Sequence, residues 1–150
     1  MKRWIWPALF VWTLVGAVAV VAWNEDAPST VVPAKGPIAW QPSFEAALQA
    51  AKQEGKPALV VFGTKTCTYC KEMDKTTWRD ARVQTQTRGW VPVRVDGDER
   101  LDLLSAYGVN AFPTAVLVGG DGKPFAAREG YVPPDEFASF LEQARAKWKS

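Results

Sequence analysis

Apolar positions along the chain repeat in two ways, and together they predict the elements of one α/β domain. Between residues 44 and 54 apolar residues recur at helical spacing behind Ser43, a residue type favoured at helix N-caps. The unbroken apolar run 58–63 has the length of a strand that is buried on both faces. The same patterns predict further strands at 90–95, 114–118 and 124–129, and further helices near 67 and over 80–87, 99–107 and 134–148.

Prolines and glycines refine these elements. Pro92 lies inside the strand at 90–95 and favours an edge position or a bulge, because proline has no N–H for a sheet. Gly108 is expected to end the helix over 99–107, and Pro134 fits the first turn of the last helix. With a first strand before residue 44, the order of elements is β-α-β-α-β-α-β-β-α.

The N-terminal part of the chain has the pattern of a membrane-spanning helix. Residues 4–23 include no charged side chain, and a helix of this length spans about 30 Å, the thickness of the hydrocarbon core of a bilayer. Lys2 and Arg3 precede the run, and Glu25 and Asp26 follow it. The positive-inside rule therefore predicts an N-terminus in the cytoplasm and a chain that continues outside.

This pattern divides the chain into three parts. Residues 1–23 are interpreted as an anchor in the cytoplasmic membrane, residues 24–37 as a linker rich in proline, and residues 38–150 as one domain. The alternative is a cleaved signal peptide, for which Ala17-Val18-Ala19 is a suitable small-residue site. Both interpretations predict a domain that faces the periplasm or the cell exterior.

Composition then excludes several kinds of function. The chain of 150 residues has no histidine, so imidazole bases, histidine metal ligands and Ser-His-Asp triads are absent. Without Lys2 and Arg3 it carries 16 basic and 16 acidic residues, a balance that argues against nucleic acid as a partner. There are only two cysteines, three positions apart. The candidate chemistry is therefore concentrated at Cys67 and Cys70.

Cys67 and Cys70 directly follow the predicted buried strand. If Cys67 opens a helix, both side chains share one helical face, and the free N–H groups of the first turn point at the first sulfur. These groups favour a thiolate over a thiol, and Lys65 and Lys71 add positive charge nearby. We therefore predict that Cys67 attacks a disulfide and that Cys70 resolves the resulting mixed disulfide.

Other interpretations of the cysteine pair are weaker. A structural disulfide here closes a loop of only four residues, worth roughly 2 kcal/mol, and joins no distant elements. A zinc site needs about four ligands, which this chain does not supply with two thiolates and no histidine. Covalent haem attachment needs Cys-x-x-Cys-His, and position 71 is lysine. Two incidental buried cysteines, and delivery of copper or another soft metal through the two thiols, stay open as alternatives.

Four segments resemble the thioredoxin superfamily, and in particular exported domains related to the C-terminal domain of DsbD. They are the strand 58–63, the motif Cys-Thr-Tyr-Cys at 67–70, Phe-Pro-Thr at 112–114, and Gly-Tyr-Val at 130–132. The resemblance covers about residues 38–148. It implies a thioredoxin-like fold, with a central mixed β-sheet flanked by helices, and a cis-proline loop that faces the cysteines.

The resemblance also implies a function. We expect a thiol–disulfide oxidoreductase with Cys67 and Cys70 as the redox-active pair, and with Tyr69, Phe112 and Pro113 in contact with the substrate. It would reduce protein disulfides outside the cytoplasmic membrane, draw electrons from a membrane thiol carrier, and need neither a metal nor a cofactor beyond its cysteines. The alternative from another class is a thioredoxin-like module that binds or scaffolds a partner without catalysis.

The chain departs from the family pattern near the cysteines. Thr66 and Gly63 stand where aromatic residues are usual, and Val61 replaces a buried acid that is thought to accept the proton of the resolving cysteine. Glu72 and Asp74 are the candidates to replace that acid, although charged residues early in a helix are often only solvated.

Overall fold

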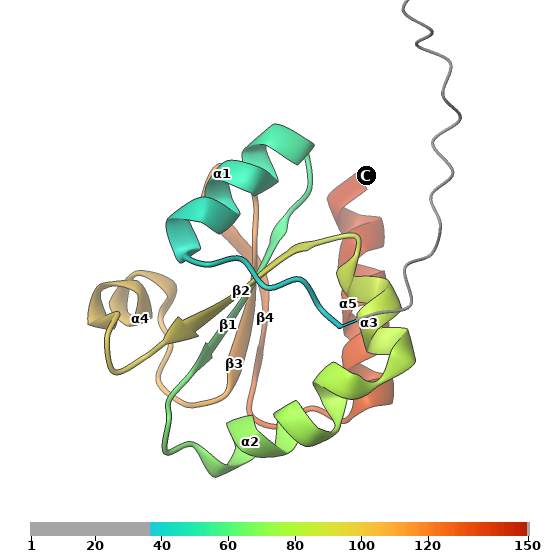
Figure 1. The fold of residues 1–150 in the computed structure, drawn as a ribbon. Helices are drawn as coiled ribbons and strands as arrows, with labels where there is room; N and C mark the ends of the chain where they lie inside the picture. Colours follow the sequence, from blue (N-terminus) through green and yellow to red (C-terminus); the bar gives the residue numbers. More distant parts are fainter. Residues whose placement is uncertain (1–36, 150) are drawn as a thin grey trace, which may run out of the picture. The chain divides into compact units, whose positions relative to one another are not determined.

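The structure is a computed structural model and describes residues 37–149. Its helices are α1 (Phe44–Glu54), α2 (Thr68–Lys75), α3 (Ala81–Thr87), α4 (Leu101–Tyr107) and α5 (Pro134–Lys149), with a 3₁₀ turn, η1 (Thr77–Arg79). Its strands are β1 (Ala58–Gly63), β2 (Val91–Asp96), β3 (Thr114–Val118) and β4 (Pro124–Glu129). Figure 1 shows the strands at the centre, with α4 on one side and α3 and α5 on the other.

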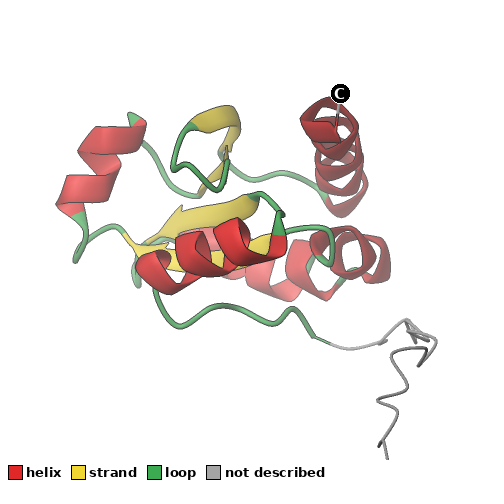
Figure 2. Ribbon diagram, turned by 90° about the horizontal axis from the view of Figure 1, so that it is seen from above, coloured by secondary structure: helices red, strands yellow, loops and turns green. Residues whose placement is uncertain are grey.

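The four strands form one mixed sheet in the order β2-β1-β3-β4. β1 is parallel to β2 and antiparallel to β3, and β3 is antiparallel to β4. The view from above in Figure 2 shows helices on both sides of these strands. The expectation of a central mixed sheet flanked by helices is therefore confirmed for the described residues.

The core has two layers because the side chains of β1 alternate between the two faces of the sheet. Leu59 and Val61 pack on one face with residues of η1, α3 and α5. Val60 and Phe62 pack on the opposite face with residues of α1 and α4. All four are buried, which explains why the sequence shows a continuous apolar run here rather than an alternating one.

Most predicted elements are confirmed. Ser43 caps α1, since its hydroxyl accepts the N–H of Ala46, and Gly55 ends that helix in a left-handed conformation. Pro92 lies on an edge strand, as expected. The first strand is wrong: before α1 only Gln41 pairs with β2, in an isolated bridge to Val93. The physical reason lies in the next two residues, because proline has no N–H to extend the pairing and Ser43 already caps the helix.

The predicted anchor and most of the linker lie outside the described residues, so residues 1–23 as an anchor or signal peptide stay a prediction. Between residues 37 and 149 no helix is both long enough and apolar enough to cross a bilayer.

A buried hydrogen bond joins the end of the α2 region to the segment after β4. The hydroxyl of Thr77, fully buried, donates to the carbonyl oxygen of Val132 at 2.8 Å. We expect Thr77→Val to lower the free energy of unfolding by about 1–3 kcal/mol, because this buried carbonyl would lose its donor. Urea unfolding measures the change. Thr85→Val is the control, since the exposed hydroxyl of Thr85 donates to the carbonyl of Ala81 and water can replace it. Equal losses in both variants would contradict the account.

Candidate active site

Cys67 is the N-cap of α2. It directly precedes the first helical residue, and its Sγ accepts a hydrogen bond from the backbone N–H of Cys70 at 3.1 Å. Its own N–H is held by the carbonyl oxygen of Thr64, in the short turn that follows β1. The sulfur thus occupies the position of a capping oxygen, at the positive end of the helix. This arrangement favours a thiolate at Cys67 when the pair is reduced.

Cys70 lies one turn further along and forms a disulfide with Cys67. Both residues are partly buried. Gly63, the last residue of β1, lies against the Cys70 sulfur, and a Cβ at this position would stand only 3.0 Å from Sγ. A side chain there would push Cys70 away. Glycine at position 63 therefore leaves space beside the second sulfur.

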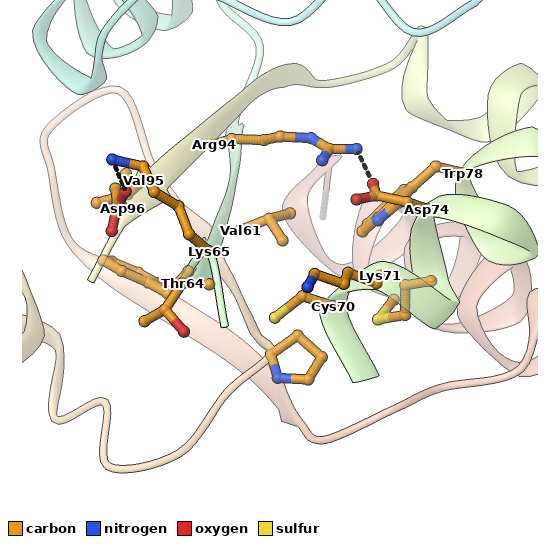
Figure 3. Close-up of a pocket in the computed structure, with 14 residues that line it drawn as sticks. Val61, Thr64, Lys65, Cys70, Lys71, Asp74, Trp78, Arg94, Val95 and Asp96 are labelled. Atoms are coloured by element: carbon orange, nitrogen blue, oxygen red, sulfur yellow. Dashed lines mark ion pairs between the residues drawn. The ribbon is translucent and has the colours of Figure 1, made fainter. Parts of the chain in front are cut away.

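A cavity of about 400 Å³ opens beside Cys70 (Figure 3). Its apolar wall includes Val61, Met73 and Trp78, and all three are buried. Five charged residues also line it, and two of them form an ion pair in which an oxygen of Asp74 lies 2.6 Å from a guanidinium nitrogen of Arg94. Cys70 therefore faces a cavity that is mostly apolar but has the Asp74–Arg94 ion pair in its wall.

The Asp74–Arg94 pair is relevant to the buried acid that Val61 replaces in this chain. Val61 lies in the cavity wall and supplies no proton acceptor. Of the two sequence candidates, Asp74 lines the cavity, whereas Glu72 is half exposed and lies 3.9 Å from the ammonium group of Lys75. Asp74 is thus the candidate that the structure brings into the cavity beside Cys70.

Pro113 lies next to the cysteines, as the sequence predicted. The peptide bond between Phe112 and Pro113 is cis, and Pro113 lines the same cavity as Cys70. Its carbonyl oxygen accepts the N–H of Gly130 at 2.7 Å, which ties this loop to the end of β4. Phe112 is only partly buried and packs against Gly97, where an added methyl group would overlap its ring. The roles of both residues in substrate contact stay predictions.

Tyr69 is exposed between the two cysteines, with 62% of its surface accessible. Its ring lies 6.4 Å from that of Tyr131, and the Tyr131 hydroxyl is 3.2 Å from that of Thr76. Tyr131 was not among the substrate-contacting residues expected from the sequence. Its position just after β4, in the Gly-Tyr-Val segment, was the available signal.

Lys65 contributes less free positive charge than the sequence suggested. Its ammonium group lies 3.2 Å from Glu99 and 3.5 Å from Asp96. The hydrogen bond to Glu99, together with the charges of both carboxylates, raises the pKa of Lys65 above its ordinary value. The positive charge of Lys65 is therefore shared with two acids on the β2–α4 side.

No cluster of three or more histidine, cysteine, aspartate or glutamate side chains suited to a metal occurs within residues 37–149.

A family model described as a thioredoxin-like domain matches residues 44–145, which is more than half of the chain. The chain belongs to the thioredoxin-like domain family.

Two solved structures and one curated protein place this thioredoxin-like domain among its relatives. The thiol:disulfide interchange protein DsbD of Yersinia pestis is 28% identical over 119 residues, covering 75% of this chain and 20% of that protein. A thioredoxin from Thermus thermophilus has a TM-score of 0.68 and 28% identity, covering 75% of this chain and 91% of that one. The reduced C-terminal domain of DsbD from Neisseria meningitidis has a TM-score of 0.55 and 28% identity, covering 66% and 95%.

These comparisons confirm the resemblance to the thioredoxin superfamily and to the C-terminal domain of DsbD. The chain spans about a fifth of the length of the first curated relatives that it matches. The likeness therefore concerns the thioredoxin-like domain rather than the whole of those proteins.

The contact between Gly63 and Cys70 in this thioredoxin-like domain can be tested directly. We expect Gly63→Ala to disfavour the disulfide, because the added methyl group crowds the Cys70 sulfur in its bonded position. Overpacking of about 1 kcal/mol shifts the dithiol–disulfide equilibrium about fivefold toward the dithiol. Equilibration with glutathione buffers measures the shift.

Gly89→Ala is the matched control for Gly63→Ala. A methyl group there stands 3.3 Å from the flexible side chain of Arg145, away from the cysteines, and should leave the equilibrium unchanged. An unchanged equilibrium in Gly63→Ala as well would show that Gly63 does not position the sulfur.

Proposed function

We propose that the chain is a thiol–disulfide oxidoreductase that reduces protein disulfides through a mixed disulfide on Cys67. The observation that carries the proposal is the cap at α2, where the Cys67 sulfur accepts the N–H of Cys70 and bonds to the Cys70 sulfur. The Cys67 sulfur thus lies at the N-terminus of α2, and the Cys70 sulfur lies one turn further along the helix. Membership of the thioredoxin-like family supports the same reaction.

The reaction begins with both cysteines reduced. The Cys67 thiolate attacks one sulfur of the substrate disulfide, a new S–S bond forms, and the other substrate sulfur leaves as a thiolate that takes up a proton. The Cys70 thiol then loses its proton and attacks the Cys67 sulfur, which releases the second substrate thiol. Two electrons have passed to the substrate, and the domain holds the Cys67–Cys70 disulfide described above. A thiol donor, proposed to be a membrane thiol carrier, then reduces that disulfide.

Substrate contact is assigned to the surface around Cys67. Tyr69 offers an exposed ring beside the reactive sulfur, and Pro113 lies across the site within the same cavity lining as Cys70. An extended peptide that carries the oxidised cysteine would lie between these two residues. Phe112, the residue before this proline, is proposed to contribute to the same contact surface, and its ring packs on Gly97.

The proposed location is outside the cytoplasmic membrane, with residues 1–23 as the anchor. The support comes from the sequence, because residues 4–23 carry no charge and Lys2 and Arg3 precede them. Disulfides of substrate proteins persist in such oxidising compartments, where a reductase of this kind has substrates.

Cysteine variants test the proposed reaction. In an insulin-reduction assay with dithiothreitol, the full chain should catalyse turnover, and Cys67→Ser should reduce the rate to that of dithiothreitol alone. Cys70→Ser should also lose most of its turnover. After the variant has been reduced and the dithiothreitol removed, it should accumulate a covalent mixed disulfide with the substrate, because no second thiol resolves the Cys67 adduct. Thr85→Ser, on the exposed side of α3, is the control and should retain full activity. Equal turnover in Cys67→Ser would favour the non-catalytic binding module instead.

A further inference from the structure

The segment before α1 reaches the candidate active site through Trp40. The next residue, Gln41, donates its N–H to the carbonyl of Pro92 at 2.8 Å and bridges to β2. This pairing holds the segment along the edge of the sheet. The Trp40 ring then packs edge-on against Trp78, with 5.2 Å between the ring centroids. Trp78 itself lines the cavity beside Cys70, so Trp40 stands directly behind the cavity wall.

Trp40 also contacts the charged part of that wall. The guanidinium carbon of Arg94 lies 4.5 Å from the centroid of the Trp40 ring, the geometry of a cation–π contact. Arg94 comes from β2, where Val93 and Val95 point into the opposite face of the core. Its guanidinium is directed at the carboxylate of Asp74, as Figure 3 shows. Arg94 is therefore held from two sides, by the ring of Trp40 and by the carboxylate of Asp74.

The cavity beside Cys70 is lined by five charged residues from three segments: Lys65 from the turn after β1, Lys71 and Asp74 from α2, and Arg94 and Asp96 from β2. Lys65 and Asp96 pair with each other. Asp74 is paired only with Arg94 among the ion pairs of the described residues. If Arg94 turned away, the charge of Asp74 would face the cavity without a partner and would oppose a thiolate at Cys70.

We propose that Trp40 is a positioning residue for the redox pair: by holding Arg94 against Asp74, it keeps the cavity beside Cys70 favourable to the thiolate that resolves the mixed disulfide. This inference rests on the proposed function, but the titration that tests it does not require turnover. Trp40 lies just before the segment 44–145 that the family model matches.

The physical reason is the freedom of an arginine side chain. With about half of its side chain exposed, Arg94 has many rotamers available, and an exposed ion pair alone restrains it weakly. An aromatic face beneath the guanidinium removes much of this freedom. Because the Asp74–Arg94 pair is itself about half exposed, its effect on Cys70 should also weaken as salt concentration rises.

The test is a thiolate titration of Cys70 in the full chain carrying Cys67→Ser, followed by ultraviolet absorbance. Trp40→Leu should shift the titration midpoint to higher pH, with the thiol–thiolate equilibrium changed about two- to fivefold, as expected for loss of an exposed cation–π contact. Trp40→Phe keeps an aromatic face and should restore most of the wild-type midpoint. Trp148→Leu, in an exposed residue of α5, is the matched control and should leave the midpoint unchanged.

The decisive comparison is a double-mutant cycle with Arg94→Gln. Arg94→Gln alone should shift the midpoint in the same direction as Trp40→Leu. In the double variant, Trp40→Leu should add no further shift to that of Arg94→Gln, because the Trp40 ring acts through the Arg94 guanidinium. An undiminished additional shift in the Arg94→Gln background would overturn the proposal, as would an equal shift in Trp148→Leu or no shift in Trp40→Leu. These results are independent of the insulin assay, so a chain that titrates as expected but has no turnover would count against the proposed function alone.

Discussion

The hydrogen bond from the Cys70 N–H to the Cys67 sulfur is the interaction on which the rest of the site depends. It makes a cysteine the cap of α2 and fixes where that helix begins relative to the buried strand β1. The helix N-terminus supplies partial positive charge at the sulfur, whereas the charge of Lys65 is shared between two carboxylates. In the proposed reaction, the nucleophilic character of the Cys67 sulfur would come mainly from this backbone geometry.

Elements on both sides of the cap hold the cysteines in place. β1 is buried between two core layers, so the turn that leads to Cys67 starts from a rigid strand, and its last residue, Gly63, leaves room for the Cys70 sulfur. The cis-proline loop is tied to the end of β4 by the hydrogen bond from Gly130 to Pro113, which holds it at the same cavity. With Val61 in the cavity wall, acidic and basic groups come instead from α2 and β2 as the Asp74–Arg94 pair.

Local signals predicted most of the fold. α1, β1, β3 and β4 have the bounds that the sequence indicated, because a serine cap, a terminal glycine and continuous apolar runs act within a few residues. The first strand failed because Pro42 has no N–H to extend the pairing beyond the single bridge at Gln41, and Ser43 already caps α1. Of the site, the cysteine pair and Pro113 were predictable from motifs. The contacts of Arg94 with Trp40 and Asp74, and of Tyr131 with Tyr69, join residues far apart in the sequence, and neither spacing nor composition records such pairs.

The central claim is that Cys67 is the nucleophile because it caps α2. Its most direct test is the thiolate titration of Cys67 in the full chain carrying Cys70→Ser, compared with that of Cys70 in Cys67→Ser. The account predicts that Cys67 ionises at a pH below the ordinary cysteine value of about 8.5, and at a lower pH than Cys70. A Cys67 midpoint at or above that value, or a Cys70 thiol that ionises first, would contradict it.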